Sequence, residues 1–434
     1  MKKQGFIFYG WFIVAAGIVS YALGYGARYS FSVIFPALLT EFQWPRDTTA
    51  IMLSVHLLVY GFVAPLAGNF VDRIGPRKTM ASGSILLSLG LAISAGSSQP
   101  WHFYVSFGVL TGAGLCLIGA VPFTTVLRNW FETKRGLAFS LLFCGAGAAF
   151  AWYPVIAFLI ESKGWQKTFM IEGVVLSVFM LPLIIGVIRY HPREKGLISD
   201  NSVKTAGGPT ASETGAALIV DHAWAAVAWT LPNAIRTHRF WLLCLCSFSM
   251  WGVTQHIMVA HHVAFAIDLG YSRIYASSVL SLFGIFFVVG SLAASMSDRI
   301  GRENAMIIGA IIGITGILVL LFMKNTSDSW MLYYYAIAFG FSNGVSAPTI
   351  AAATTDIFQG PRVGATLGFV WFSFAIGGAI GPWLGGWIFE FTQSYEAAFL
   401  VAIGWQAVAG AALWGSSPRK VRRVPGQMIF RPKS

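Results

Sequence analysis

Long apolar runs recur along the whole chain and limit what it can fold into. Of the 434 residues, 56% are hydrophobic and 11% are charged, whereas soluble domains carry about 25% charged residues. A run of about 17–25 apolar residues is long enough to cross a membrane as a helix. The runs are too long and too uniformly apolar for the alternating pattern of a membrane β-barrel. The sequence therefore predicts an all-α integral membrane protein that lies in the lipid bilayer.

Twelve of these runs are predicted to be membrane-spanning helices. We place them at residues 10–36, 48–70, 79–97, 101–125, 134–160, 166–189, 239–266, 273–297, 303–323, 329–352, 362–389 and 395–415. A polar segment divides them into two six-helix bundles, at residues 1–190 and 238–434, the second with a short cytoplasmic tail. The cytoplasmic linker, 191–237, is expected to contain a short helix with Thr230 as N-cap and Pro232 in its first turn.

Basic residues lie mainly on one side of this arrangement. With both termini on the same side, that side holds 23 Lys and Arg and the other holds 5, while Arg28 lies within a span. Because cytoplasmic loops carry an excess of Lys and Arg, we expect both termini in the cytoplasm and the protein in the cell (inner) membrane. The net charge of +12 does not indicate a nucleic-acid partner, since the basic residues form no single stripe.

Chemistry-bearing motifs are missing from the sequence. The cysteines have no metal-ligand spacing, and all of them fall in apolar runs. We expect them to be small, buried hydrophobic residues: Cys116, Cys144, Cys244 and Cys246. We find no ATP-binding motif and no catalytic constellation. The sequence therefore predicts neither an enzyme nor a primary pump, and no metal or other cofactor.

The two halves repeat a short motif, which points to a transporter. Residues 72–75 and 298–301 both read Asp-Arg-Ile-Gly, 226 positions apart, after the second and the eighth predicted helices. Parallel repeats about an axis normal to the membrane mark one large transporter architecture.

Around this motif the sequence resembles the major facilitator superfamily. The loop after the second helix in that family is close to Gly-x-x-x-Asp-Arg-x-Gly-Arg-Arg/Lys, and residues 68–78 match it except that Pro76 replaces a frequent basic residue. Within the superfamily the chain is similar to the branch of monocarboxylate transporters and oxalate–formate antiporters. The stretches that carry this similarity are residues 9–11, 128–138, 164–165 and 377–385.

The resemblance implies that the repeated motif forms a conformational gate. Its carboxylate would meet helix N-termini and neighbouring arginines, lock the outward-open state, and release as the halves rock. A tight turn carrying topological charge is the alternative, and the second copy of the motif favours the gate. The expected gate residues are Asp72, Arg73, Gly75, Asp298, Arg299 and Gly301.

Arg28 is the one basic residue placed well inside a predicted span. An arginine there costs at least about 2.5–3.5 kcal/mol on insertion scales, and such residues usually mark substrate or ion pathways. The alternatives are snorkelling to the interface or a structural hydrogen bond to a neighbouring helix. Arg28 and His56 each lie eight residues from the outer end of their helices. Antiparallel neighbours at this equal depth could face one another.

Polar and aromatic side chains could complete an anion site around Arg28, which can hold a carboxylate through two parallel hydrogen bonds. Tyr21 and Tyr25 lie on the same helical face as Arg28. The intramembrane histidines could instead bridge helices, His261 and His262 cannot both face a cavity, and the asparagine could serve packing. The expected substrate-binding residues are Arg28, Tyr25, Tyr21, His56, His256, His261, Asn343 and Trp371.

The sequence departs from the branch in its charged residues. Carriers of this branch usually have an arginine in the eighth helix, where this chain has Ser291, and the eleventh helix has no Lys or Arg between Val363 and Glu390. Intramembrane acids are nearly absent; Glu172 is the one candidate, in a helix that is normally peripheral. A monoanion is therefore favoured over a dicarboxylate that needs two cationic clamps.

We expect secondary active or facilitative transport of a small organic anion, with a monocarboxylate favoured, by alternating access. Proton symport would need a titrating group such as His56, His256 or His261, whereas anion exchange would need none. A proton-driven exporter of a drug or metabolite is the alternative, disfavoured because helices 1, 4 and 5 lack an acid. A non-transporting sensor is disfavoured by the short stretch after Trp414. One chain supplies both halves, so a monomer would suffice.

Overall fold

The computed structural model describes residues 8–131, 135–197, 218–359 and 363–424, except for the side chains of residues 72, 135 and 136. Nearly all of these residues are helical. The described residues also form an isolated antiparallel β-bridge between Ile219 and Arg422. The prediction of an all-α protein is confirmed.

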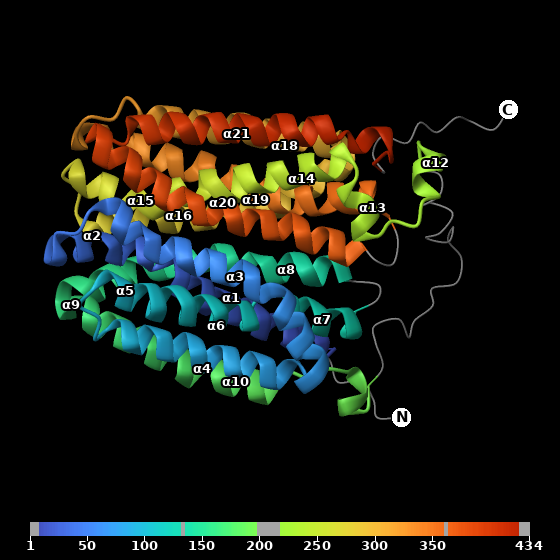
Figure 1. The fold of residues 1–434 in the computed structure, drawn as a ribbon, viewed down its shortest axis with the longest axis horizontal. Coiled ribbons are helices and arrows are strands. Elements are labelled where there is room, and N and C mark those ends of the chain that lie inside the picture. The colour runs from blue at the N-terminus through green and yellow to red at the C-terminus, as the bar shows by residue number, and fades with distance from the viewer. Residues whose placement is uncertain (1–7, 132–134, 198–217, 360–362, 425–434) are drawn as a thin grey trace.

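The first half is a bundle of long helices, several of them built from consecutive segments (Figure 1). These segments are α1 (Gly10–Tyr29), α2 (Phe31–Phe42), α3 (Arg46–Ile74), α4 (Pro76–Ser94), α5 (Pro100–Phe103), η1 (Tyr104–Leu110), α6 (Thr111–Ile118), α7 (Ala120–Trp130), α8 (Arg135–Ala148), η2 (Ala149–Trp152), α9 (Tyr153–Val175), η3 (Leu176–Met180) and α10 (Leu181–Val187).

The second half has the same kind of construction. Its segments are α14 (His238–Ser247), η6 (Phe248–Thr254), α15 (Gln255–Asp268), α16 (Arg273–Ala293), η7 (Ala294–Met296), α17 (Ser297–Ile300), α18 (Arg302–Leu320), α19 (Trp330–Ile357), α20 (Val363–Thr392) and α21 (Glu396–Ser416). Short helices α12 (His222–Ala225) and α13 (Leu231–Ile235) precede it. As predicted, Thr230 is the N-cap of α13 and Pro232 lies in its first turn, although the Thr230 side chain makes no capping hydrogen bond among the described residues.

The helices are consistent with twelve membrane crossings. Nine stretches of the described chain are long and apolar enough to cross a membrane. One of them, Leu137–Val187, has 51 residues and turns at Gly164, where φ is +82°, so it makes two crossings. The less apolar α4 and α19, with 19 and 28 residues, supply the other two.

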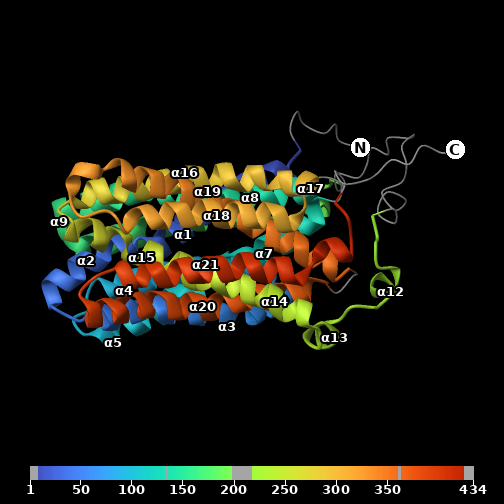
Figure 2. The same cartoon turned by 90° about the horizontal axis from the view of Figure 1, so that it is seen from above.

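The two halves lie side by side with their helices nearly parallel, as two views at right angles show (Figures 1 and 2). Among the described residues, the contacts that join the halves include α2 with α15, α3 with α20, and α8, η2 and α9 with α16. Helices α12 and α13 lie at one end of the bundle, which we call the linker end. The connections α2–α3 and α15–α16 lie at the opposite end, which we call the far end.

Glycines allow the helices of different halves to cross closely. A Cβ atom on Gly284 of α16 would lie 2.5 Å from the carbonyl oxygen of Gly147 on α8. Such small-residue crossings are typical of packing between membrane helices. The contact brings the two backbones together near the end of α8 and midway along α16.

Candidate functional site

Arg28 on α1 and His56 on α3 meet inside the first half, as their equal depth predicts. The Nε–H of Arg28 donates to His56 Nε2 at 3.0 Å, and the two residues are only 1% and 0% exposed. Because His56 Nε2 accepts this bond, the ring hydrogen lies on Nδ1. That atom is 2.8 Å from Thr111 Oγ1 and 3.3 Å from the Phe107 carbonyl oxygen. The arginine is held in the interior and does not snorkel to the interface.

Two half-buried tyrosines flank the guanidinium group. Its carbon lies 5.0 Å from the ring centre of Tyr25 and 4.3 Å from that of Tyr60, which is within the range of a cation–π interaction. The two tyrosine hydroxyl oxygens are 3.2 Å apart. The ring of Tyr21 lies 5.1 Å from that of Tyr25, and its hydroxyl is buried without a partner among the described residues. We did not predict Tyr60, although it follows His56 by one turn of the same helix.

The outer nitrogens of Arg28 are the unusual feature of this cluster. Nη1 and Nη2 are buried and have no hydrogen-bond partner in the described part of the chain. Every ion pair found there involves another basic residue, and none reaches Arg28. Leaving a buried charged donor unpaired costs more than the roughly 1–3 kcal/mol typical of a neutral group. These two nitrogens are therefore unused donors of the kind that hold a carboxylate through parallel hydrogen bonds.

The second half contributes two polar residues near this cluster. Gln255 on α15 donates from Nε2 to the hydroxyl of Tyr29 at 3.2 Å, which links the two halves, and its Oε1 is buried without a partner. His256 donates from Nδ1 to carbonyl oxygens of Trp251 and Gly252 at 2.9 and 3.1 Å. Its Nε2 is also buried and unpaired. His256 lies within electrostatic range of both Arg28 and His56.

Two π-helical segments position these histidines. Phe107, whose carbonyl oxygen contacts His56, lies in η1, and the two carbonyl groups that accept from His256 lie in η6. A π-helical turn displaces carbonyl groups from the regular α-helical bonding pattern, and such turns are frequent at functional sites. Here the displaced carbonyls are available to the histidine side chains.

The remaining predicted substrate residues have other partners. His261 bonds the Pro382 carbonyl oxygen at 2.7 Å and the Tyr395 hydroxyl at 3.3 Å. His261 therefore bridges helices, which is the alternative to substrate binding that we considered for the intramembrane histidines. Asn343 donates to the Phe339 carbonyl oxygen at 2.9 Å, and its Oδ1 is buried and unpaired. Trp371 packs on Trp251 at 5.9 Å between ring centres. Trp371 therefore packs against η6, which contains Trp251.

Ser291 faces another helix of its own half. Its hydroxyl donates to the carbonyl oxygen of Phe287 at 2.9 Å and lies 3.3 Å from that of Gly344 on α19. A Cβ atom on Gly344 would lie 2.1 Å from the Phe287 carbonyl oxygen. The position is therefore at a tight crossing between α16 and α19.

An ion-pair network joins the halves at the far end. Arg46, at the start of α3, lies 2.8 Å from Asp268 at the end of α15 and donates to Tyr395 at 2.5 Å. The backbone N–H of Arg46 donates to Glu390 at 2.7 Å. We call these four residues the far-end lock. We did not predict these residues. The sequence signal that could have found them is the opposite charge of Arg46 against Asp268 and Glu390, which all lie near helix ends.

The repeated motif adopts the same turn in both halves. Gly75 and Gly301 have φ of +83° and +97°, a left-handed conformation that favours glycine. In the second copy Asp298 pairs with Arg302 at 2.6 Å, and Arg302 also bonds Asp356 at 2.9 Å.

The other motif residues differ in what they contact. Arg73 and Arg299 are exposed, and the side chain of Asp72 lies outside the described residues. Arg302, which ties α18 to α19, was not among the predicted gate residues.

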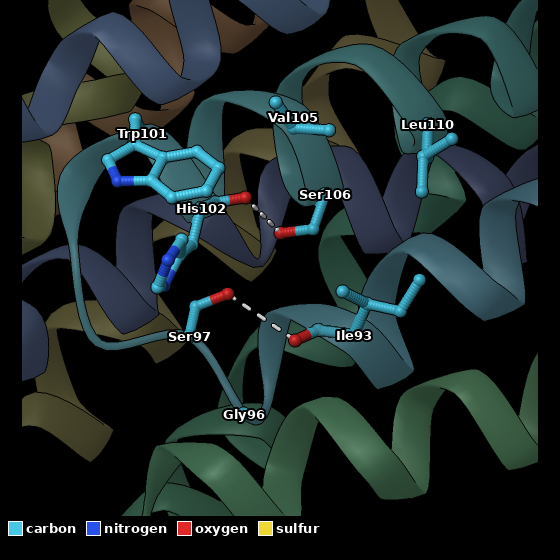
Figure 3. Close-up of a pocket in the computed structure, with 8 residues that line it drawn as sticks. All are labelled: Ile93, Gly96, Ser97, Trp101, His102, Val105, Ser106 and Leu110. Atoms are coloured by element: carbon cyan, nitrogen blue, oxygen red, sulfur yellow. Dashed lines mark hydrogen bonds between the residues drawn. The ribbon is translucent and has the colours of Figure 1, made fainter.

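Two surface hollows of the described structure lie away from Arg28. One of about 250 Å³ lies at the connection between α4 and η1 (Figure 3). Its polar groups are used locally: Ser97 donates to the Ile93 carbonyl oxygen at 3.3 Å and Ser106 to that of His102 at 2.8 Å. The hollow is part of a loop corner, whereas Arg28 and His56 are buried.

Comparisons with known proteins agree on the kind of molecule. The family model described as Major Facilitator Superfamily matches residues 17–327 and again residues 243–432. Monocarboxylate transporter 13 of Rattus norvegicus is 26% identical over 396 residues, covering 91% of this chain and 86% of the relative. The uncharacterized MFS-type transporter YcxA of Bacillus subtilis is 25% identical over 408 residues, covering 92% and 93%.

Solved structures share the fold at low sequence identity. A bacterial homologue of the human lysosomal transporter Spinster, in an inward-facing and unoccupied conformation, matches with a TM-score of 0.69 at 14% identity, covering 97% of this chain and 100% of that one. A mutant of the nucleoside transporter NupG gives 0.68 at 12% identity, covering 93% and 100%.

Proposed function

The chain belongs to the major facilitator superfamily, and from this premise we propose that it carries a small organic anion, best a monocarboxylate, bound at Arg28. Members of the family are transporters of small molecules across the bilayer, and not enzymes. The finer assignment rests on the chemistry of the arginine cluster.

The unpaired Nη1 and Nη2 of Arg28 carry this proposal. His56 occupies Nε and holds the guanidinium plane, so the two outer nitrogens form a fixed fork. A carboxylate bound there would supply the missing charge and two hydrogen bonds. Unpaired Nε2 of His256 and the rings of Tyr25 and Tyr60 would border the bound molecule.

The cluster favours a single carboxylate on the substrate. Arg28 is the one arginine of the cluster, and the nearby groups of Gln255 and His256 are neutral or weakly basic. A second carboxylate would find no second cation of comparable strength. Several relatives bear the name monocarboxylate transporter, which supports the same class.

We propose alternating access as the mechanism, with both termini in the cytoplasm and the far end on the outer side. The distribution of Lys and Arg supports this orientation. The far-end lock would hold the outer side closed, and the Asp298–Arg302–Asp356 group would hold α17, the start of α18 and the end of α19 together. Rocking of the two halves would expose Arg28 to each side in turn.

Uptake into proteoliposomes tests the proposal. A panel of labelled monocarboxylates, dicarboxylates, nucleosides and cationic drugs is offered with and without a pH gradient. We expect uptake of at least one monocarboxylate, loss of it in Arg28→Ala, and normal uptake in the control Arg236→Ala, which changes an arginine of the linker. Uptake of a nucleoside or a cation instead, independent of Arg28, would overturn the assignment.

A further inference from the structure

Glu172 is a buried carboxyl group that the anion site does not use. It lies on α9 within the apolar stretch Leu137–Val187 and is 9% exposed. Its Oε2 is 3.3 Å from the hydroxyl oxygen of Ser30. Ser30 separates α1 from α2, two residues after Arg28, and keeps helical backbone angles with φ −56° and ψ −23°. The carboxyl group therefore touches the residue that joins α1, which carries the arginine, to α2.

The hydroxyl of Ser30 has two candidate acceptors and one hydrogen. Its oxygen lies 2.9 Å from the Ala27 carbonyl oxygen and 3.3 Å from Glu172 Oε2. The shorter contact is the better place for the hydroxyl hydrogen. A second hydrogen is then needed between Ser30 and Glu172, and a protonated carboxyl group supplies it.

Among the described residues, no basic side chain forms an ion pair with Glu172. The described helices that pack on α9 include α2, α4 and α16, and the hydroxyl of Ser30 is the side-chain group within hydrogen-bond distance of Glu172 among the described residues. The charged or titratable groups on these helices and on α9 itself are Glu41, Arg77, Lys78, Arg273, Tyr275, Tyr153, Glu161, Lys163 and Lys167.

Those groups have other environments. Glu41 bonds Gln166 at 3.2 Å, Arg77 bonds the Ile188 carbonyl oxygen at 3.0 Å, and Arg273 lies at the far-end start of α16 in electrostatic range of Glu161. On α1, the guanidinium of Arg28 is held by His56 and Tyr60. An unpaired carboxylate inside the bilayer is far less stable than the neutral acid.

We propose that Glu172 is the proton-binding site that couples anion transport to a proton gradient, an inference that rests on the proposed transport function. In the described conformation the carboxyl group carries the proton and donates to Ser30. When the halves rock and water reaches Glu172, the proton leaves to water and the O–H···O bond to Ser30 is lost. The carboxylate then requires the Ser30 hydrogen, which weakens the Ser30–Ala27 bond beside Arg28.

The histidines are less suited to this role. Both nitrogens of His56 are engaged, and a proton added at Nε2 would face the N–H of Arg28. His261 is likewise bonded at both nitrogens. A proton on His256 Nε2 would add a second positive charge near Arg28. The two positive charges would repel each other. Glu172 can change its charge without disturbing the arginine's own contacts.

The test compares Glu172→Gln with Glu161→Gln, the same change at an exposed position of α9 on the other side of the turn at Gly164. In proteoliposomes we expect Glu172→Gln to exchange anions at close to the wild-type rate and to lose accumulation driven by a pH gradient. Glu161→Gln should retain both. Intact pH-driven accumulation in Glu172→Gln would overturn the proposal.

Infrared spectroscopy separates this inference from the transport function. The purified wild type should show the C=O stretch of a protonated carboxyl group that is lost in Glu172→Gln and retained in Glu161→Gln. If that band is present and titrates while no anion is transported, the proposed function fails and proton binding stands. Absence of the band from the wild type would overturn proton binding at Glu172.

The variant Ser30→Ala tests the direction of the hydrogen bond. If Ser30 accepts from the neutral acid, its removal destabilises that form, and the band should titrate at lower pH than in the wild type. A shift to higher pH would show that Ser30 instead stabilises a carboxylate, which contradicts the proposed proton arrangement.

Discussion

Arg28 is held by partners that use only part of its hydrogen-bonding capacity. His56 takes Nε, two tyrosine rings flank the guanidinium, and the outer nitrogens are free among the described residues. A purely structural arginine would be expected to satisfy these buried donors with carbonyl or carboxylate groups. The unsatisfied fork therefore distinguishes a binding group from a helix-bridging one.

Tyr60 should act through its ring more than through its hydroxyl. Tyr60→Phe retains the ring 4.3 Å from the guanidinium and removes only the contact with Tyr25, so anion affinity should stay close to that of the wild type. Tyr60→Leu also removes the cation–π interaction, worth about 0.5–2 kcal/mol. We expect a severalfold loss of affinity, measured by equilibrium binding of a labelled anion. Equal affinities for the Phe and Leu variants would contradict a role for the ring.

His56 should orient the arginine without carrying the transported proton. The amide oxygen of Gln in His56→Gln can still accept from Arg28 Nε, so we expect pH-driven accumulation to persist, with reduced anion affinity. Uptake against a concentration gradient, measured at two external pH values, checks this. Loss of pH coupling with anion exchange intact would instead assign the proton to His56.

At the scale of helices, the site depends on a close crossing between α3 and α6. A Cβ atom on Gly112 would lie 2.6 Å from the backbone carbonyl oxygen of His56. Gly112→Ala must therefore displace α3 or α6, at a cost of about 1–3 kcal/mol. We expect a lower thermal unfolding temperature and reduced anion binding.

The matched control for this prediction is Gly186→Ala on α10. No atom lies within 4 Å of a Cβ built on Gly186, so its stability and binding should match the wild type or improve slightly. If Gly112→Ala behaves like this control, the crossing beside His56 is not tight in the membrane.

The sequence predicted helices more completely than it predicted contacts. Run lengths and the repeated Asp-Arg-Ile-Gly motif were sufficient for an all-α transporter fold, because helices that cross a bilayer must be long and apolar. Helical rise alone paired Arg28 with His56. The partners of His261, Pro382 and Tyr395, could not be predicted because they lie more than 120 residues away in the sequence. The π-helical turn η6 likewise has no sequence pattern that we recognised.

At the scale of the whole molecule, the far-end lock should bias the balance between conformations. Asp268→Asn removes the charge that pairs with Arg46 across the two halves at 2.8 Å. We expect the far ends to separate more often, seen as longer distances between spin labels at Gln43 and Gln393, which are both exposed. The control Asp328→Asn changes a carboxylate of the α18–α19 connection that forms no ion pair among the described residues. Unchanged distances in Asp268→Asn would show that the lock does not set this balance.

Equilibrium binding of a labelled monocarboxylate to the purified protein tests the central claim most directly. Arg28→Lys keeps the charge and loses the planar fork, so at least one charge-assisted hydrogen bond of about 1.5–3 kcal/mol is lost. The account predicts roughly a 10- to 100-fold weaker Kd for Arg28→Lys, no measurable binding for Arg28→Ala, and wild-type affinity for Arg236→Ala. Wild-type affinity in Arg28→Ala would contradict it.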